Sequence, residues 1–371
     1  MRIVFAGGGT GGHVLPTLAV ADELRSRVSG LDAVFVGSRS GFEAKLVPQA
    51  GYPIRFIAAR GVRGKGLLAK LRNAPYMGVG FVQSLGIVGR LRPDVVFGSG
   101  GYASAATVLA AACLRRPIVL QEQNSIPGTA NRALGRCARR IYLGFEKARP
   151  FFGDRDGVIV TGNPIRRGIA GGRDAAARAA FGLSADRPVL LVFGGSQGAR
   201  ALNRAAVEYL AERRGLQAIV QTGDRDLAWV RERLAGEERR CFIAPYIESM
   251  VEAYRSADAV LSRSGALSCS EIAAAGLPAV LVPYPYATDD HQHWNALALV
   301  ETGGAIIIED SALDAASLAA ALDPLFSDPA RLEKMGRSLA AVARPDAAGR
   351  IADDIEALVA SRDRGARRRH R

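Results

Sequence analysis

The feature that most constrains this sequence is a motif that occurs once in each half of the chain. Residues 4–12 read Val-Phe-Ala-Gly-Gly-Gly-Thr-Gly-Gly, and residues 191–198 read Leu-Val-Phe-Gly-Gly-Ser-Gln-Gly. Each is a short apolar run that leads into glycines and then into a helical pattern, which is how a nucleotide-binding α/β unit begins. Two such openings predict two Rossmann-like domains.

The rest of the chain continues the alternation of apolar runs and Ala/Leu-rich helical patterns. Helices are predicted over 15–28 and 103–114, and strands over 2–6, 33–37, 95–98, 117–121, 140–143, 189–193, 217–221, 241–244, 259–262, 279–282 and 305–308. Strands without polar alternation, separated by helices, are typical of parallel sheets covered on both faces. The predicted class is therefore α/β, with two doubly wound domains facing each other across a cleft.

Proline positions suggest where the domains meet. Pro164 restricts the residue before it, so we expect a boundary there, with domains over 1–163 and 164–345. The helix predicted at about 346–361 follows Pro345 and is expected to pack back on the first domain. The tail 362–371 carries six arginines and is predicted to be a disordered basic segment.

Composition narrows the classes of function. The 371 residues carry a formal charge of +13, which favours anionic partners such as phosphates, nucleic acid or acidic lipid. An aromatic content of 6% disfavours the stacking platforms of an RNA-binding protein. No signal peptide or membrane-spanning run is visible, and four widely spaced cysteines are expected to be buried thiols. These features favour the cytoplasm.

Glycine-rich turns between strand and helix predict anion sites, because backbone N–H groups and the helix N-terminus can hold a phosphate. Besides 7–12 and 194–198, a third such turn lies at 98–102. The first matches G-x-G-x-x-G, but Ser38-Arg39 stands where NAD binding needs an acidic residue. An NADP-dependent reductase therefore stays open as an alternative, beside a tight turn without ligand.

The richest stretch in the second half is 263–278, where a strand ends and small residues begin a helix. Glu271 lies inside that helix, where a carboxylate can accept bonds from a ribose diol or simply favour the helix dipole. Polar residues at 289–295 suit hydroxyl recognition. His291, His293 and the Asp224-Arg225-Asp226 triplet lack a second supporting ligand set, so no metal site is predicted.

Two places in the first half carry groups that can move protons. His13 lies at the first turn of the helix after the opening glycines, and an imidazole with a pKa of about 6.5 suits proton transfer. A helix-start histidine with only a local hydrogen bond is the alternative. The segment 121–124, Gln-Glu-Gln-Asn, follows a strand at the edge where α/β sheets bind ligands.

In combination, these motifs resemble those of the MurG family of glycosyltransferases, in family 28. The resemblance covers residues 3 to about 355 and rests on 8–13, 98–102, 122–124, 162–166, 194–199 and 264–271. It implies the GT-B fold and an inverting transfer of GlcNAc from UDP-GlcNAc to the C4 hydroxyl of MurNAc in lipid I, undecaprenyl-diphosphate-MurNAc-pentapeptide, to give lipid II. It implies no cofactor, no metal, no nucleic acid, and a peripheral place on the cytoplasmic face of the membrane.

Carried over by position, the resemblance also implies site residues. The donor site would comprise Thr10, Gly11, Gly12, Asn124, Arg166, Ser196, Ile247, Ala266, Leu267, Ser268, Cys269, Ser270, Glu271 and Gln292. The acceptor diphosphate would lie at Gly9, Thr10, Gly11, Gly100, Gly101 and Tyr102. The residues considered for deprotonating the acceptor are His13 and Glu122. The family often has histidine where this chain has Gln121, which shifts weight onto those two. A UDP-GlcNAc 2-epimerase or another glycolipid transferase stays open.

One segment predicts membrane contact. Between Glu43 and Asp94 the sequence has nine basic residues and no acidic one, interleaved with apolar residues. An apolar patch rimmed by cations is typical of a surface that lies on anionic lipid, although a core-packing helix with a basic outer face has the same pattern. The expected patch comprises Leu67, Leu68, Lys70, Leu71, Arg72 and Tyr76.

Overall fold

The chain divides into two compact units. The computed structural model describes residues 1–59, 67–170 and 172–369, and for the helical stretches 67–74 and 363–369 it describes the backbone alone. Unit 1 comprises Met1–Ile165 together with Asp346–Arg371, and unit 2 comprises Arg166–Pro345. The first boundary lies two residues after the one expected at Pro164.

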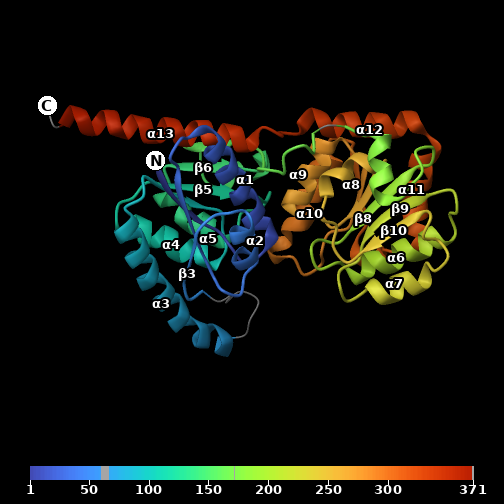
Figure 1. Cartoon of the computed structure of the whole chain (residues 1–371), viewed down its shortest axis with the longest axis horizontal. Coiled ribbons are helices and arrows are strands. Elements are labelled where there is room, and N and C mark those ends of the chain that lie inside the picture. Colours follow the sequence, from blue (N-terminus) through green and yellow to red (C-terminus); the bar gives the residue numbers. More distant parts are fainter. Residues whose placement is uncertain (60–66, 171, 370–371) are drawn as a thin grey trace. The chain divides into compact units, whose positions relative to one another are not determined.

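Unit 1 is built on a parallel sheet in the order β3-β2-β1-β4-β5-β6-β7 (Figure 1). Its strands are β1 (Arg2–Ala6), β2 (Asp32–Gly37), β3 (Ile54–Phe56), β4 (Val95–Gly98), β5 (Ile118–Glu122), β6 (Arg140–Leu143) and β7 (Val158–Val160). Its α-helices are α1 (Gly11–Arg27), α2 (Glu43–Gln49), α3 (Leu67–Leu91), α4 (Tyr102–Cys113), α5 (Thr129–Leu134) and α13 (Ala347–Arg369).

Alternate strand residues build a core on each face of this sheet, as the period of a strand requires. Ile3 and Phe5 point into a cluster with α1 and α13, whereas Val4 points into the opposite cluster with α3 and α4. Because both faces are covered, most strand positions are apolar, and the polar residues lie mainly at strand ends. Four α13 residues are buried in the first cluster, so this last helix is part of the core of unit 1: Ile351, Ala352, Ile355 and Leu358.

Unit 2 repeats the plan with the order β10-β9-β8-β11-β12-β13. Its strands are β8 (Val189–Phe193), β9 (Gln217–Gln221), β10 (Cys241–Ala244), β11 (Ala259–Ser262), β12 (Ala279–Leu281) and β13 (Ala305–Ile307). Its α-helices are α6 (Arg200–Ala211), α7 (Leu227–Arg233), α8 (Met250–Ser256), α9 (Ala266–Ala275), α10 (His291–Val300), α11 (Ala315–Ser327) and α12 (Pro329–Val342). Both orders are those of doubly wound sheets, and the predicted GT-B fold class of two Rossmann-like units is confirmed.

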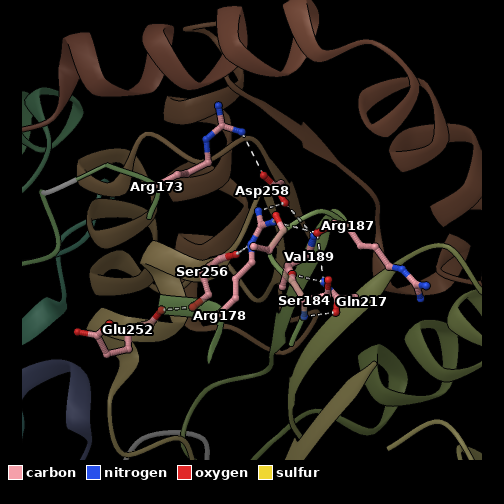
Figure 2. A network of polar contacts seen from close by, with 10 residues as sticks. Arg173, Arg178, Ser184, Arg187, Val189, Gln217, Glu252, Ser256 and Asp258 are labelled. Atoms are coloured by element: carbon pink, nitrogen blue, oxygen red, sulfur yellow. Dashed lines mark hydrogen bonds and ion pairs between the residues drawn. The ribbon is translucent and has the colours of Figure 1, made fainter. Parts of the chain in front are cut away.

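A polar network ties the start of unit 2 to the amino ends of its central strands (Figure 2). The buried guanidinium of Arg178 donates to the carbonyl of Ser256 at 3.1 Å and to Asp258 at 2.8 Å. The same Asp258 carboxylate accepts the N–H of Val189, the first residue of β8, at 2.8 Å. Gln217, which opens β9, exchanges two bonds with the backbone of Ser184. This end of the sheet is therefore structural.

Three expectations differ from the structure. The strands β3 and β7 were not predicted, because each is only three residues long and β3 is half-exposed. Residues 362–369, expected to be disordered, continue α13 as helix, which suits arginine and alanine and a basic helix C-terminus. Cys241 and Cys269 are buried as expected, but Cys113 and Cys137 are exposed because they end surface helices.

Candidate functional site

The site begins where each sheet changes winding direction. In unit 1 that point lies between β1 and β4, and in unit 2 it lies between β8 and β11. All four strands lead into glycine-containing loops at their carboxyl ends. Open α/β sheets bind ligands at this edge and at this point of reversal. The fold therefore places the three predicted glycine turns and the 263–265 turn at the two ligand-binding positions.

In unit 1 the two glycine loops pack backbone against backbone. A Cβ atom at Gly101 would clash with the carbonyl oxygen of Gly8, and one at Gly7 would clash with the hydroxyl of Ser99. Gly101 also has a φ of 85°, a conformation that favours glycine. These glycines are required for contact between the loops, whether or not a ligand is bound.

His13 is fixed at the junction of these loops. Its carbonyl accepts hydrogen bonds from Ser99 Oγ at 3.1 Å and from Thr17 Oγ1 at 2.7 Å. Its ring lies against Gly100, where a Cβ atom would come within 3.0 Å of Cε1 and 3.2 Å of Nδ1. The side chain is half-buried. His13 is thus a positioned imidazole at the ligand-binding edge, as a proton-transfer group needs to be.

Glu122, the other proposed base, is held differently. It is 2% exposed, and its Oε1 accepts from the N–H and Nδ2 of Asn124 at 3.0 and 3.3 Å. Its Oε2 accepts from the N–H of Gly128 at 3.1 Å and from Nδ2 of Asn131 at 2.9 Å. Burial raises the pKa of the Glu122 carboxyl, and these hydrogen bonds oppose that shift. With both oxygens engaged, Glu122 anchors the 124–128 loop.

Gln121 occupies a buried amide network. Its Nε2 donates to Asn163 Oδ1 at 2.9 Å, and Asn163 Nδ2 donates to the carbonyl of Gln123 at 3.0 Å. Gln123 Nε2 in turn donates to Gln121 Oε1 and to the carbonyl of Ser99 at 2.8 Å. The residue that replaces the family's frequent histidine therefore links β5 to the segment that ends unit 1.

A buried carboxylate that sequence reasoning missed lies beneath the first glycine loop. Glu43 is 1% exposed, and its Oε2 accepts the N–H of Gly9 at 2.9 Å. Its Oε1 accepts the N–H and the hydroxyl of Ser38 at 2.8 and 2.9 Å. The Gly9 amide, expected to bind the acceptor diphosphate, is already engaged. The one available signal was that Glu43 is the sole acidic residue between Asp32 and Asp94.

The glycine loop of unit 2 has a neutral support. Gln221, at the end of β9, is 4% exposed. It donates from Nε2 to the carbonyl of Gly195 at 2.9 Å and accepts the N–H of Ile247 at 2.8 Å. It thereby joins the loop that carries Ser196 to the loop that carries Ile247. The sequence signal for this residue is its position at the carboxyl end of the strand predicted over 217–221.

The N-terminus of α9 forms the most polar part of unit 2. Gly265 precedes the helix without a side-chain cap, and the buried Ser264 Oγ has no hydrogen-bond partner among the described residues. Unbonded first-turn amides and a hydroxyl at a helix N-terminus can accept a phosphate. The first turn consists of Ala266, Leu267 and Ser268, whose N–H groups precede the first helical bond, from Cys269 to the Gly265 carbonyl at 2.9 Å.

The buried carboxylate of Glu271 contacts the half-buried Arg166 and the buried Tyr254. Arg166 Nη1 donates to Oε1 at 3.0 Å and to Oε2 at 3.1 Å, and the Tyr254 hydroxyl donates to Oε2 at 3.2 Å. Burial raises the pKa of Glu271, while Arg166 and the Tyr254 bond oppose the shift. Sequence reasoning missed Tyr254, because α8 belongs to none of the motifs singled out in the sequence. Glu271 and Arg166, expected in one site, do lie in contact.

The loop after β12 supplies the remaining donor candidate. Gln292 Oε1 accepts the N–H of Tyr284 at 3.0 Å, which fixes the start of this loop. Asp289 and Asp290 both have positive φ angles, 54° and 51°, an unusual conformation for residues other than glycine. Strain of this kind is often found at binding loops, where the surrounding structure maintains it.

The polar pairs weighed as metal ligands have other partners. His291 Nδ1 lies 2.7 Å from the carbonyl of Thr288, and His293 Nδ1 lies 3.1 Å from Glu309 Oε1. Asp226 is buried, where it accepts from Asn203 Nδ2 at 2.8 Å. These groups stabilise loops and helix ends.

The expected membrane patch is only partly described. The side chains of Leu67, Leu68, Lys70, Leu71 and Arg72 lie outside the described residues, although the backbone there is helical. Further along α3, Tyr76, Val79 and Val82 are 38%, 51% and 65% exposed. Residues three apart share one face of a helix, so these side chains form an apolar outer strip. Within the described ranges no helix has the length and apolarity that crossing a bilayer requires.

Comparisons with known proteins agree with this layout. Residues 3–143 match the glycosyltransferase family 28 N-terminal domain, and residues 189–351 match the glycosyltransferase family 28 C-terminal domain. A protein from Chlorobaculum parvum is 44% identical over 364 residues, which is 96% of this chain and 99% of that protein. It is named UDP-N-acetylglucosamine--N-acetylmuramyl-(pentapeptide) pyrophosphoryl-undecaprenol N-acetylglucosamine transferase.

Solved structures give the same placement. The crystal structure of Acinetobacter baumannii MurG is 31% identical, has a TM-score of 0.75, and aligns over 96% of this chain and 98% of its own. A UDP-GlcNAc 2-epimerase from Neisseria meningitidis bound to UDP-GlcNAc has a TM-score of 0.67 over 95% of this chain and 99% of its own, but only 14% identity. The second likeness shows a shared fold alone. The chain belongs to glycosyltransferase family 28 and, within it, to the MurG family.

Proposed function

We propose that the protein transfers GlcNAc from UDP-GlcNAc to the C4 hydroxyl of MurNAc in lipid I, which yields lipid II and UDP. The observation that carries this proposal is the 44% identity to a transferase of that name over nearly the whole of both chains. The two switch-point sites, one in each unit, suit a reaction between two phosphorylated ligands.

The donor binds unit 2 in this proposal. The diphosphate lies at the N-terminus of α9, near Ser264 and the amides of 266–268, where the helix dipole and the unpartnered hydroxyl favour an anion. Glu271 accepts from Arg166 Nη1 on both oxygens, from the Tyr254 hydroxyl on Oε2 and from the backbone N–H of Arg166, which together fill about four acceptor positions. A ribose hydroxyl that binds Glu271 therefore shares or replaces one of these contacts. Ser196, Ile247 and Gln292 complete the proposed donor contacts within unit 2. The resemblance also gives Thr10, Gly11, Gly12 and Asn124 of unit 1 to the donor, but we assign the amides of Gly11 and Gly12 to the acceptor.

The acceptor diphosphate binds unit 1. The Gly9 amide is bonded to Glu43, and the Gly100 amide is bonded to Ser104 Oγ at 3.3 Å. We therefore assign the diphosphate to the amides that begin the helices α1 and α4. Gly11 and Gly12 open α1, and their N–H groups precede the hydrogen bonds of the helix itself. The start of α4, at Gly101 and Tyr102, supplies a second set.

His13 is the proposed base. It takes the proton of the C4 hydroxyl as that oxygen attacks C1 of GlcNAc, the bond from C1 to the UDP oxygen breaks, and its electron pair leaves with UDP. The anomeric carbon is inverted because attack and departure occur on opposite faces. Glu271 occupies only Nη1 of Arg166, so Nε and Nη2 can stabilise the charge that develops on the diphosphate. Glu122 supports this site through the 124–128 loop.

Unit 1 also holds the proposed membrane contact. The exposed strip at Tyr76, Val79 and Val82 continues the basic and apolar segment that begins at Leu67. We place this face of α3 on the cytoplasmic leaflet, which carries anionic lipid and the lipid-linked acceptor. The protein is then peripheral, and its partners are lipid and sugar nucleotide rather than nucleic acid.

One assay tests the function. The purified protein is incubated with radiolabelled UDP-GlcNAc and a lipid I analogue, and we expect labelled disaccharide lipid together with one equivalent of UDP. Absence of lipid labelling in a folded, UDP-GlcNAc-binding preparation would contradict the proposal. Formation of UDP-ManNAc without acceptor would indicate an epimerase, and labelling of a different glycolipid would reassign the acceptor.

A further inference from the structure

The proposed mechanism leaves one buried ionisable group in unit 1 without a role. Glu43, the first residue of α2, is 1% exposed, and no lysine or arginine among the described residues forms an ion pair with it. Burial of an unpaired carboxylate is costly unless hydrogen bonds compensate for lost hydration. Its compensation comes from the Gly9 N–H, the Ser38 N–H and the Ser38 hydroxyl, at 2.8–2.9 Å.

The side chain of Glu43 is tightly enclosed by three glycines. A Cβ atom at any of three nearby glycines would come closer than 3.0 Å to its carboxylate or its Cγ: Gly8, Gly37 and Gly41. These glycines come from the ends of β1 and β2 and from the turn before α2. Glu43 therefore fills a cradle formed by three segments of the ligand-binding edge.

The bond to Gly9 decides which amides of the first loop face a ligand. Gly9 has a φ of 93°, and its N–H points inward to Glu43 Oε2 across 34 residues of sequence. Thr10 then has an extended backbone, and α1 begins at Gly11 with Gly12 exposed. Fixing Gly9 thus fixes the direction from which the chain enters α1 and presents its first amides.

We propose that Glu43 is a positioning residue for the acceptor diphosphate. By holding the Gly9 amide it orients the loop so that the amides of Gly11 and Gly12, at the N-terminus of α1, meet the diphosphate. Glu43 itself does not touch the ligand. This inference deepens the proposed function and depends on it, because the anion in question is the diphosphate of the lipid-linked acceptor.

The decisive variant is Glu43→Gln, which keeps the shape of the side chain. The two carboxylate oxygens serve different backbone N–H groups, Gly9 on one and Ser38 on the other. An amide has only one oxygen, so its NH2 group must face one of those donors. Ser38→Ala is the milder variant, because it removes one hydroxyl bond to Glu43 and leaves both backbone bonds in place. Glu146→Gln, an exposed carboxylate of the same unit, is the matched control.

Steady-state kinetics with UDP-GlcNAc and a lipid I analogue test the proposal. We expect Glu43→Gln to raise the acceptor KM about tenfold, the loss of one charge-assisted hydrogen bond, and Ser38→Ala to raise it by roughly threefold. The donor KM should stay within about twofold in both variants, and Glu146→Gln should match the wild type. Amide exchange at Gly9, followed by NMR, should accelerate in Glu43→Gln but not in the control.

Two outcomes would overturn the role of Glu43. One is an acceptor KM near that of the wild type in a folded Glu43→Gln variant, and the other is an equal rise in both KM values. If Glu43→Gln does not fold, the acceptor KM of Ser38→Ala decides in the same way. A wild-type enzyme that does not use the lipid I analogue at all would instead contradict the proposed function, so the two failures are distinguishable.

Discussion

The two glycine loops that follow the first strand of each unit are supported from beneath by groups of different charge. In unit 1 the carboxylate of Glu43 takes the N–H of Gly9, whereas in unit 2 the amide of Gln221 donates to the carbonyl of Gly195. A buried carboxylate lowers the positive potential of its loop, and a neutral amide does not. Similar backbones can therefore differ in the anion affinity of the loop itself.

This difference suggests a division of work between the units. Loop 7–12 holds His13 and the start of α1 in place, and its Gly9 amide is not available to an anion. Loop 194–198 stays neutral beside the α9 site proposed for the diphosphate of the donor. We expect changes in unit 1 to affect the chemical step and the acceptor, and changes in unit 2 to affect binding of the donor.

The largest effect is expected for His13→Ala. Loss of a general base should lower kcat on the order of 10²-fold or more, with the donor KM nearly unchanged. The measurement is kcat at saturating substrates across a pH series, in which the limb due to the base should also disappear. A variant with near wild-type kcat would show that His13 is not the base. It would also contradict the assignment of the chemical step to unit 1.

The next effect is expected for Glu271→Ala. Loss of a buried, charged hydrogen-bonding group should weaken donor binding by about 2–3 kcal/mol, or roughly 30- to 150-fold in the donor KM. The acceptor KM should not change. The wild type should discriminate against a 2′-deoxy donor, and the variant should not. Glu252→Ala, an exposed carboxylate on α8 of the same unit, is the control. Persistent wild-type discrimination in Glu271→Ala would exclude a ribose contact.

Gln221→Glu tests the comparison itself, because it gives the loop of unit 2 a carboxylate like that of unit 1. The added charge and the lost donor to Gly195 should raise the dissociation constant of UDP about tenfold. Gln221→Met removes the bond to Gly195 and also the bond from the Ile247 N–H, without adding charge. If charge matters, calorimetry should therefore find UDP binding weaker in Gln221→Glu than in Gln221→Met. Equal weakening in both variants would mean that charge beneath the loop is unimportant.

The smallest effect is expected on removal of divalent cations. The proposed contacts to both diphosphates are backbone amides and Arg166, so no step needs a bridging cation. EDTA in the transfer assay should leave the rate within about twofold of the untreated enzyme, as expected where amides and a guanidinium hold the phosphates. If EDTA abolishes activity and Mg²⁺ restores it, a bound cation rather than the helix termini is the main source of charge stabilisation.

Much of the fold could be predicted from the sequence because its strands are buried on both faces. Runs such as 189–193 and 259–261 are apolar at every position, and the structure has strands over these residues. β3 and β7 escaped detection because three residues carry no period. Residues 362–369 gave the opposite error, since their charge indicated disorder while their helix propensity favoured helix.

The site was predictable only where the signal is local. The contact of Glu271 with Arg166 spans 105 residues, yet each residue belongs to a recognisable motif. The bond from Gly9 to Glu43 has no such signal, since it depends on the packing of α2 against the end of β1. The engagement of Glu122 by Asn131 and Gly128 is tertiary in the same way, and a list of polar residues cannot distinguish an anchor from a base.

The return of the chain to unit 1 after Pro345 has a consequence for biosynthesis. The first core of unit 1 stays incomplete until Ile351, Ala352, Ile355 and Leu358 have been made, whereas unit 2 is complete at Pro345. At about 5–20 residues per second, roughly 10–40 s of translation separate the end of β7 from these residues. We therefore expect the second unit to fold first on the ribosome, with the apolar side of α1 exposed to chaperones meanwhile. Pulse proteolysis of chains truncated at Pro345 should find unit 2 resistant and unit 1 cleaved, and equal resistance would contradict this order.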